Sequence, residues 1–315
     1  MSSLTFKVIS DPIAAKSLWE QFSPHLTVDD EWDFRNIWIE SLDFPLYFIV
    51  GFDQDKPIGL LPLQLDKGMG IGPKVLGLTD EFLEFFGGVD TDNNKVYVLP
   101  GYEDTISSFL QEIKKPSILA PLETPYAVKD NVAKQYIDRY ELDLTQFSNF
   151  EALLQKQFDG KSRQRLINRL NKLQKDYSIE IRDGSVEDLP ILFQLSIDRF
   201  GENSSFNMEY RRQVFIKIAQ TIPSDIFTIL VNGTPKAVSH SMVYKGVYNT
   251  LNIGYDYSIR DISKLLVVSQ LKRAIERECI LFDAGKGDNG WKEHFHLKKI
   301  PQYKLSLNLP LAQTE

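Results

Sequence analysis

The stretch IFTILVNGTPKAVSHSMVYKGVYNTLNIGY, residues 226–255, decides the fold. Its apolar, β-branched and aromatic residues form three runs, separated by dipeptides that end in glycine, Asn232-Gly233 and Lys245-Gly246. Asn-Gly is a strong signal for a two-residue hairpin turn, because both central residues of that turn adopt a positive φ. The stretch therefore predicts three consecutive antiparallel strands: Ile226–Val231, Pro235–Tyr244 and Val247–Tyr255.

Helical periodicity surrounds these three strands. A long helix is predicted from about Ser263 to Glu278, and a short strand, Ile280–Asp283, follows it. Ser185 can cap a helix, with Asp188 three residues further on. The other predicted elements of this half are a strand at Ile179–Arg182, helices over Val186–Phe200, Met208–Ala219 and Asp288–Phe295, and a last strand at Gln302–Leu309.

The first half of the chain shows the same order of elements without visible sequence identity. A strand at Leu4–Ile9 is followed by a helix that begins at Asp11-Pro12, and Trp32 and Trp38 indicate a second helix. Two β-rich runs come next, Leu46–Phe52 and Pro57–Leu65. Hairpins followed by a helical crossover imply an α+β sheet in each half, so we expect two tandem domains, 1–145 and 146–315, each with a mixed, mostly antiparallel sheet flanked by helices.

Composition excludes several classes of protein. The 315 residues are 43% hydrophobic and 25% charged, which is typical of globular domains and excludes a disordered chain. The single cysteine, Cys279, can form neither an internal disulfide nor a thiolate zinc site, and we expect no bound metal. The longest apolar stretch, Phe44 to Phe52, is too short to span a bilayer, and the first residues lack a leader pattern. A cytoplasmic protein without integral membrane association is therefore expected.

One segment carries a charge opposite to that of the whole chain. The net charge is -7, yet residues 156–175 hold seven basic residues against one acid, Asp159. On a helical wheel the basic residues after Lys161 gather on one face, while Leu166, Leu170, Leu173 and Tyr177 share another. This basic helix is either a solvated surface or a contact surface for a phosphate-bearing ligand.

The most specific motif lies near the C-terminus. Phe282-Asp283-Ala284-Gly285-Lys286-Gly287-Asp288, followed by Trp291-Lys292, resembles the signature of the CelD-type/FemAB-like acyltransferases of the GNAT superfamily. Weaker matches to the same family are Leu76–Phe82, Asp143-Leu144 with Lys161-Ser162-Arg163 and the basic helix, and Asn252–Asp256 with Ser263–Leu266. Together these stretches extend the resemblance over nearly the whole chain.

The resemblance implies two GNAT-like units in tandem and transfer of an acyl group. The expected donor is acetyl-CoA or another acyl-CoA, and the acceptor is an amine or hydroxyl of a small molecule, a saccharide or a cell-envelope precursor. FemAB relatives use aminoacyl-tRNA instead, so tRNA is the alternative partner. A non-catalytic binding protein on a degenerate GNAT fold is the third possibility. The N-terminal domain is expected to be structural or to bind the acceptor.

Donor binding departs from the usual pattern of the superfamily. Its glycine-rich turn at a helix N-terminus is replaced here by residues 256–264, which contain no glycine. Side chains would then have to bind the donor phosphates in place of backbone amides. The candidates are Arg163, Arg165, Arg169, Arg260, Ser263 and Lys264.

Catalysis on an amine needs a base, because the attacking nitrogen must lose a proton. His240, between two serines in a predicted strand, is the candidate base, although such a histidine is often a buried structural residue. Asp283 ends a predicted strand and is the second catalytic candidate; a turn-forming role is its alternative. We expect the strands that carry these residues to splay around one pocket, whose other lining residues are Tyr255, Asp256, Gly287, Asp288 and Lys292.

Overall fold

The computed structural model describes residues 4–68, 81–129, 131–287 and 290–309, and the chain divides into two compact units. The N-terminal unit comprises residues 1–138 and 301–315, and the C-terminal unit comprises residues 139–300. The boundary therefore lies earlier than the predicted residue 145, because residues 139–143 pair with a strand of the C-terminal unit. The last strand, predicted as part of the second domain, continues into the N-terminal unit, where it pairs with residues 117–122.

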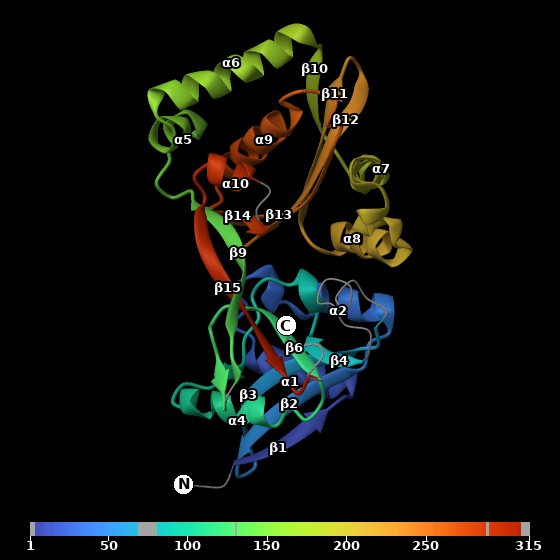
Figure 1. The fold of residues 1–315 in the computed structure, drawn as a ribbon, viewed down its shortest axis with the longest axis vertical. Coiled ribbons are helices and arrows are strands. Elements are labelled where there is room, and N and C mark those ends of the chain that lie inside the picture. The colour runs from blue at the N-terminus through green and yellow to red at the C-terminus, as the bar shows by residue number, and fades with distance from the viewer. Residues whose placement is uncertain (1–3, 69–80, 130, 288–289, 310–315) are drawn as a thin grey trace. The chain divides into compact units, whose positions relative to one another are not determined.

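The N-terminal unit is built on a mixed sheet with the strand order β1-β2-β3-β4-β6-β15. Every neighbouring pair in it is antiparallel except β4 and β6. Figure 1 labels its main elements apart from the short strands β5, β7 and β8. They are β1 (Leu4–Ile9), α1 (Pro12–Phe22), α2 (Trp32–Leu42), β2 (Leu46–Asp53), β3 (Lys56–Asp66), β4 (Phe82–Phe85), β5 (Tyr97–Val98), α4 (Ile106–Gln111), β6 (Ser117–Leu122), β7 (Ala127–Val128), β8 (Asn131–Val132), the start of β9 (Lys134–Asp143) and most of β15 (Lys298–Leu307).

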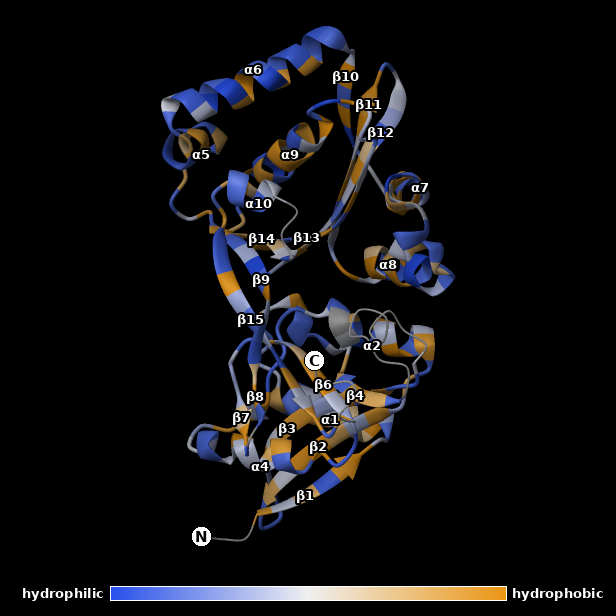
Figure 2. Cartoon of the chain, viewed as in Figure 1, coloured by the Kyte–Doolittle hydropathy of each residue, from blue (hydrophilic) through white to orange (hydrophobic). Residues whose placement is uncertain are grey.

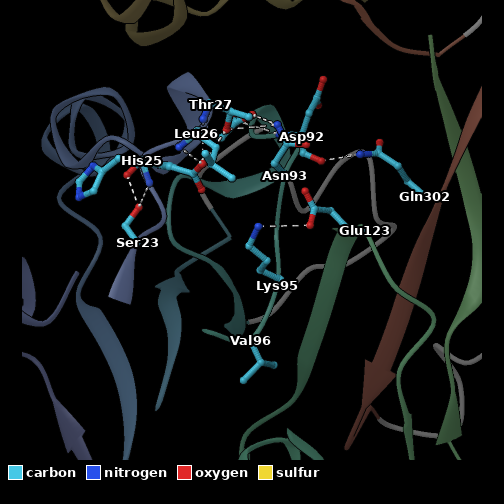
Figure 3. A network of polar contacts seen from close by, with 12 residues as sticks. Ser23, His25, Leu26, Thr27, Asp92, Asn93, Lys95, Val96, Glu123 and Gln302 are labelled. Carbon is cyan, nitrogen blue, oxygen red and sulfur yellow. Dashed lines mark hydrogen bonds and ion pairs between the residues drawn. The ribbon is translucent and has the colours of Figure 1, made fainter. Parts of the chain in front are cut away.

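A buried arginine organises the polar interior of the N-terminal unit. Arg35 of α2 donates hydrogen bonds to the side chain of Asn94 (2.7 Å) and to the carbonyl of Asn93 (3.1 Å). In Figure 3, Gln302 of β15 donates to the carbonyl of Asp92 in the same loop. Buried polar groups without partners are costly, so each of these bonds holds the loop in one conformation. The loop before β5 is thus tied both to a helix and to the last strand.

The C-terminal unit has a second mixed sheet, with the order β9-β14-β13-β12-β11-β10. All neighbouring pairs are antiparallel except β13 with β14, which confirms the predicted mixed, mostly antiparallel sheet. The three strands quoted first above form the predicted meander, with Asn232 and Gly233 at positive φ in the first turn. The strands are β10 (Ile179–Asp183), β11 (Ser224–Val231), β12 (Thr234–Tyr244), β13 (Val247–Tyr255) and β14 (Leu281–Lys286).

Helices cover both faces of this sheet. α9 contacts β12 and β13 from one side, and α7 contacts the same two strands from the other side (Figure 1). The helices of the unit are α5 (Phe150–Gln157), α6 (Gly160–Asp176), α7 (Leu189–Phe200), α8 (Glu209–Thr221), α9 (Ile262–Glu276) and the short α10 (Trp291–His294). Single 3₁₀ turns lie at Val28–Asp30, Gly88–Asp90, Glu103–Thr105, Val186–Asp188, Gly201–Asn203 and Ser205–Asn207. No helix among the described residues is long and apolar enough to cross a membrane.

The basic helix predicted over residues 156–175 is interrupted. α5 ends at Gln157, Phe158 is buried in the core against Phe295 (5.7 Å between ring centroids), and α6 begins after Asp159. The Asp159 carboxylate accepts a hydrogen bond from the backbone N–H of Ser162, as a helix N-cap does. Burial of Phe158 in an extended conformation therefore breaks the helix that the charge pattern suggested.

The apolar stripe of α6 is largely as predicted. Leu166 and Leu173 are buried and Leu170 packs against the same core, but Tyr177 lies exposed after the helix ends. In Figure 2, α6 is mostly hydrophilic with apolar positions between, whereas α9 is strongly apolar. α6 thus adheres to the unit by a narrow stripe and leaves its cations open to solvent.

The backbone of α7 approaches the sheet closely at Gly254 of β13. A Cβ built on this residue would lie 2.5 Å from the carbonyl oxygen of Leu192 in α7. Gly160, at the start of α6, has open space at the same position. Gly254 therefore sets the distance between α7 and the sheet.

We expect Gly254→Ala to destabilise the protein, because backbone atoms of α7 must move to admit the methyl group. Overpacking of this kind costs about 1–3 kcal/mol. Gly160→Ala is the matched control and should leave the free energy of unfolding unchanged or slightly raised. Urea denaturation of the three proteins measures both effects, and equal stabilities would show that α7 is not held at this distance.

Candidate functional site

The site is created by two parallel strands that separate. β13 and β14 pair only over Val247–Asn249 and Leu281–Asp283. β13 then continues to Tyr255, while β14 pairs on its other side with β9. These two strands therefore separate, which leaves the second half of β13 without a partner on that side among the described residues. The strand of His240, β12, was expected to splay with them, but it stays paired with β13 along its length.

A cavity of about 330 Å³ lies beside the unpaired half of β13. Its walls come from β13, from the start of α9, from α10 and from single residues of α6 and α7. The lining residues are Arg169, Arg199, Ile253, Tyr255, Ser263, Lys264, Val267, Gly290, Trp291, His294 and Phe295. Three permanent cations and three aromatic rings among them suit an anionic ligand with an apolar part.

Two of the cations share one carboxylate. Lys264 Nζ lies 2.7 Å from Asp261 Oδ1, and Arg169 Nη1 lies 3.4 Å from the same oxygen. Burial raises the pKa of Asp261, but the hydrogen bond from Lys264 and the charges of Lys264, Arg169 and Arg260 outweigh burial and lower it. Asp261 is therefore ionised at neutral pH, and it holds both cavity cations at the start of α9.

The third cation is bound differently. The guanidinium of Arg199 lies 4.6 Å from the ring centroids of both Phe200 and Tyr255. Among the described residues no acidic side chain pairs with it. Stacking on the two rings positions the guanidinium while leaving its N–H groups available to an anion.

His294 is the histidine that lines the cavity. It lies at the end of α10, and partial burial together with the nearby charges of Lys264, Arg169 and His296 lowers its pKa. A neutral imidazole at pH 7 has one nitrogen free to accept a proton. His294 therefore combines an exposed position in the cavity with the protonation state of a general base.

Sequence reasoning missed three residues of this cavity, Arg199, Trp291 and His294, as ligand contacts. Trp291 was identified only as part of the family motif. Their local sequence carries no signal for the cavity, because α7 and α10 meet β13 only in the folded chain. Within the part of the chain that the structure describes, no group of three His, Cys, Asp or Glu side chains is arranged to hold a metal.

His240 does not line this cavity. Its side chain is fully buried, Nε2 lies 3.1 Å from the Ser224 hydroxyl, and burial lowers its pKa to about 4. The neighbouring Ser239 accepts a hydrogen bond from Gln270 of α9 (2.9 Å), so His240 points to the opposite face of the sheet. The imidazole is in the environment of a neutral core residue.

Asp283 points to the same face as His240 and does not line the cavity either. The neighbouring Phe282 stacks on Tyr248 (5.8 Å between centroids) in the α9 core, so Asp283 faces away from α9. Its carboxylate lies 2.7 Å from Arg139 Nη2 and accepts from the backbone N–H of Gly285 (2.8 Å). These contacts give Asp283 a structural role in joining β14 to β9.

The other predicted residues divide into two groups. Arg169, Ser263 and Lys264, which were predicted to bind the donor, line the cavity together with Tyr255, which was predicted to line the substrate pocket. The remaining predicted residues do not line it. Asp256 accepts hydrogen bonds from Ser258 and Lys236, and buried Lys292 donates to the carbonyls of Gly285 and Lys286. Gly287 has a positive φ, Arg163 and Arg165 lie on α6, and Arg260 is largely exposed. Asp288 and the motif residues 76–80 lie outside the described residues.

Comparisons with known proteins agree with the fold described above. Residues 160–293 match the family model described as an acetyltransferase (GNAT) domain. No curated protein matches the sequence.

Solved structures match the chain over nearly its whole length. FemX is 10% identical, with 98% of this chain and 99% of that chain covered and a TM-score of 0.60. L-PGS from Bacillus licheniformis is 15% identical, with 97% and 95% covered and a TM-score of 0.57. A tandem GNAT protein from the clavulanic acid biosynthesis pathway is 9% identical, with 97% and 98% covered and a TM-score of 0.55. The fold is therefore that of tandem GNAT proteins, and the match over residues 160–293 supports a GNAT-type acyltransferase domain in the C-terminal unit.

The contacts of Asp283 lead to a stability prediction. Arg139→Leu removes the counter-charge of the buried Asp283 carboxylate, which costs about 3–5 kcal/mol, and Asp283→Asn removes the charge that faces Arg139, with a loss in the same direction. Lys16→Met, which breaks an exposed pair with Asp33, should change stability little. Urea denaturation at pH 7 measures all three. If Asp283→Asn keeps wild-type stability, the pair is not structural and Asp283 returns as a catalytic candidate.

Proposed function

We propose that the C-terminal unit transfers an acyl group, acetyl in the simplest case, from acyl-CoA to an amine or hydroxyl of a small molecule, a saccharide or a cell-envelope precursor. One observation carries the proposal: a cavity with cationic and aromatic walls lies where β13 separates from β14. The phosphate groups of the donor would contact Lys264, Arg169 and Arg199. The aromatic walls would pack against its apolar part.

The absence of a glycine-rich turn agrees with this proposal if side chains bind the donor phosphates in its place. Ser263 and Lys264 lie in the first turn of α9, where the partial positive charge of a helix start favours an anion. Arg199 adds a guanidinium, which binds phosphate through paired N–H donors. Arg163, Arg165 and Arg260 lie outside the cavity, so a role in donor binding would require a donor that extends beyond it.

The proton acceptor that we propose is His294. An amine nucleophile is an ammonium ion at neutral pH and must lose a proton before it attacks the thioester. His294 faces the cavity with a lowered pKa, whereas His240 is buried on the other face. His240 is the alternative candidate for this step, and Asp283 becomes one only if its pair with Arg139 proves not to be structural. Tyr255 is one of the two rings on which Arg199 stacks.

Aminoacyl-tRNA is the second candidate donor, and it would place the chain with the FemAB relatives of the CelD-type/FemAB-like family. The observation that favours it is the open cationic face of α6. Arg165 and Lys172 are exposed there, beyond the cavity, and neither forms an ion pair with an acid within the described part of the chain. An RNA backbone would use such a surface, whereas a coenzyme confined to the cavity would not. The N-terminal unit would then bind the acceptor or serve as a scaffold.

The pH dependence of turnover tests His294. Because only the neutral imidazole accepts a proton, activity should fall as the pH falls through the pKa of His294, with a midpoint below about 6.5. His294→Gln should lower kcat and flatten this acid limb, while His240→Gln should keep it. Thiol release from acetyl-CoA with a set of primary amines and amino sugars measures the profile. Loss of the limb in His240→Gln alone would transfer the role to His240.

Donor binding distinguishes the two donors. CoA should raise the melting temperature, because a ligand that binds only the folded state stabilises it. Arg199→Met should abolish most of that shift, and Arg165→Ala, on the same unit but outside the cavity, should keep it. For a tRNA donor, Arg165→Ala would instead weaken tRNA binding and reduce its salt dependence. If neither CoA nor tRNA binds, the non-catalytic alternative is favoured.

A further inference from the structure

An acidic side chain lies among the cations of the donor cavity. Three cations converge on the Asp261 carboxylate: Lys264 at 2.7 Å, Arg169 at 3.4 Å and Arg260 at 3.6 Å. The Asp261 side chain is only 10% exposed, whereas that of Arg169 is 47% exposed. The acid therefore lies beneath the cations, and the N–H groups that it leaves unused are open to a ligand.

The position of Asp261 is not explained by helix capping. Aspartate at a helix N-cap normally accepts from a backbone N–H of the first turn. Asp261 occupies that position before α9, but its side chain makes no capping bond, and its backbone is left-handed, with φ 67°. The carboxylate is turned toward Lys264 and Arg169, both of which line the cavity. Its principal contacts are thus with the proposed phosphate-binding side chains.

We propose that Asp261 is an internal counter-anion that weakens binding of the donor's phosphate groups; this inference rests on the proposed function. A phosphate held by Lys264 and Arg169 would lie roughly 6–7 Å from the carboxylate, where a unit charge in a partly solvated site changes anion affinity about tenfold. Asp261 also orders the two cations, which favours binding. The repulsion grows with the charge of the ligand and the ordering does not, so repulsion prevails for a polyanion.

The consequence concerns release of the product. Free CoA keeps the same phosphate groups as acyl-CoA, so phosphate contacts stabilise donor and product equally and do not speed the chemical step. Tight phosphate binding would therefore slow release of CoA, a step that limits many enzymes. Asp261 limits this uniform binding while keeping the cations ordered between turnovers.

The test compares Asp261→Asn with the wild type. Asparagine has the same shape and tolerates a left-handed backbone, so the fold should be kept, which circular dichroism verifies. Asp256→Asn is the matched control, because Asp256 is a nearby carboxylate with a lowered pKa whose cation, Lys236, is outside the cavity. Isothermal titration with inorganic pyrophosphate, CoA and pantetheine measures the affinities.

We expect Asp261→Asn to bind pyrophosphate and CoA about tenfold or more tightly, with a steeper salt dependence, and pantetheine as before. Asp256→Asn should match the wild type. An unchanged or weaker pyrophosphate affinity in Asp261→Asn, or no pyrophosphate binding by either protein, overturns the inference. If Asp261→Asn gains pyrophosphate affinity but neither protein binds CoA, the inference stands and the acyl-CoA proposal fails.

Discussion

The limited pairing of β13 with β14 is the constraint on which the rest of the C-terminal unit depends. Two parallel strands that stayed paired along their length would satisfy each other's backbone and close the sheet. Here the register ends at Asn249 and Asp283, and the backbone of β13 beyond that point faces a cavity. The α9 helix must cross from the end of β13 to the start of β14, so its first turn lies at the same opening. Strand separation and helix start thus create one site.

The C-terminal unit has two clusters of charged side chains, one at each end of α9. Near the C-terminal end of α9, the buried Asp225 carboxylate forms ion pairs with Arg273 and Arg277 and also accepts a hydrogen bond from the Tyr248 hydroxyl (2.7 Å). Both carboxylate oxygens therefore have partners. At the other end of α9, Asp261 is outnumbered by cations that remain partly exposed. Arg273 also pairs with Asp183 (2.7 Å), so two carboxylates balance the two arginines of the first cluster. In the second cluster three cations share Asp261, which leaves a net positive charge that suits an external anion.

Local signals predicted most of the fold. The Asn232-Gly233 hairpin and the capping box of Ser185 with Asp188 formed as expected, since each depends on neighbouring residues. The helix break at Phe158 and the pairing of β9 with β14 were not predictable, because both follow from contacts with residues more than a hundred positions away. The site divides in the same manner. Lys264 was recognised at a helix start, but Arg199 and His294 reach the cavity only through packing of α7 and α10.

The cavity by itself does not decide between the two candidate donors, and α6 supplies the remaining argument. A cavity of about 330 Å³ accommodates a small group, whether the pantetheine end of a coenzyme or the terminal nucleotide of an RNA. Both would place phosphates near Arg169, the residue at which α6 meets the cavity. Beyond it, Arg165 continues along the exposed face, at a distance from the cavity that a compact coenzyme does not need to reach. A cationic surface of this extent, in a chain of net charge -7, favours a ligand with an extended phosphate backbone. The same surface argues neither for nor against a coenzyme.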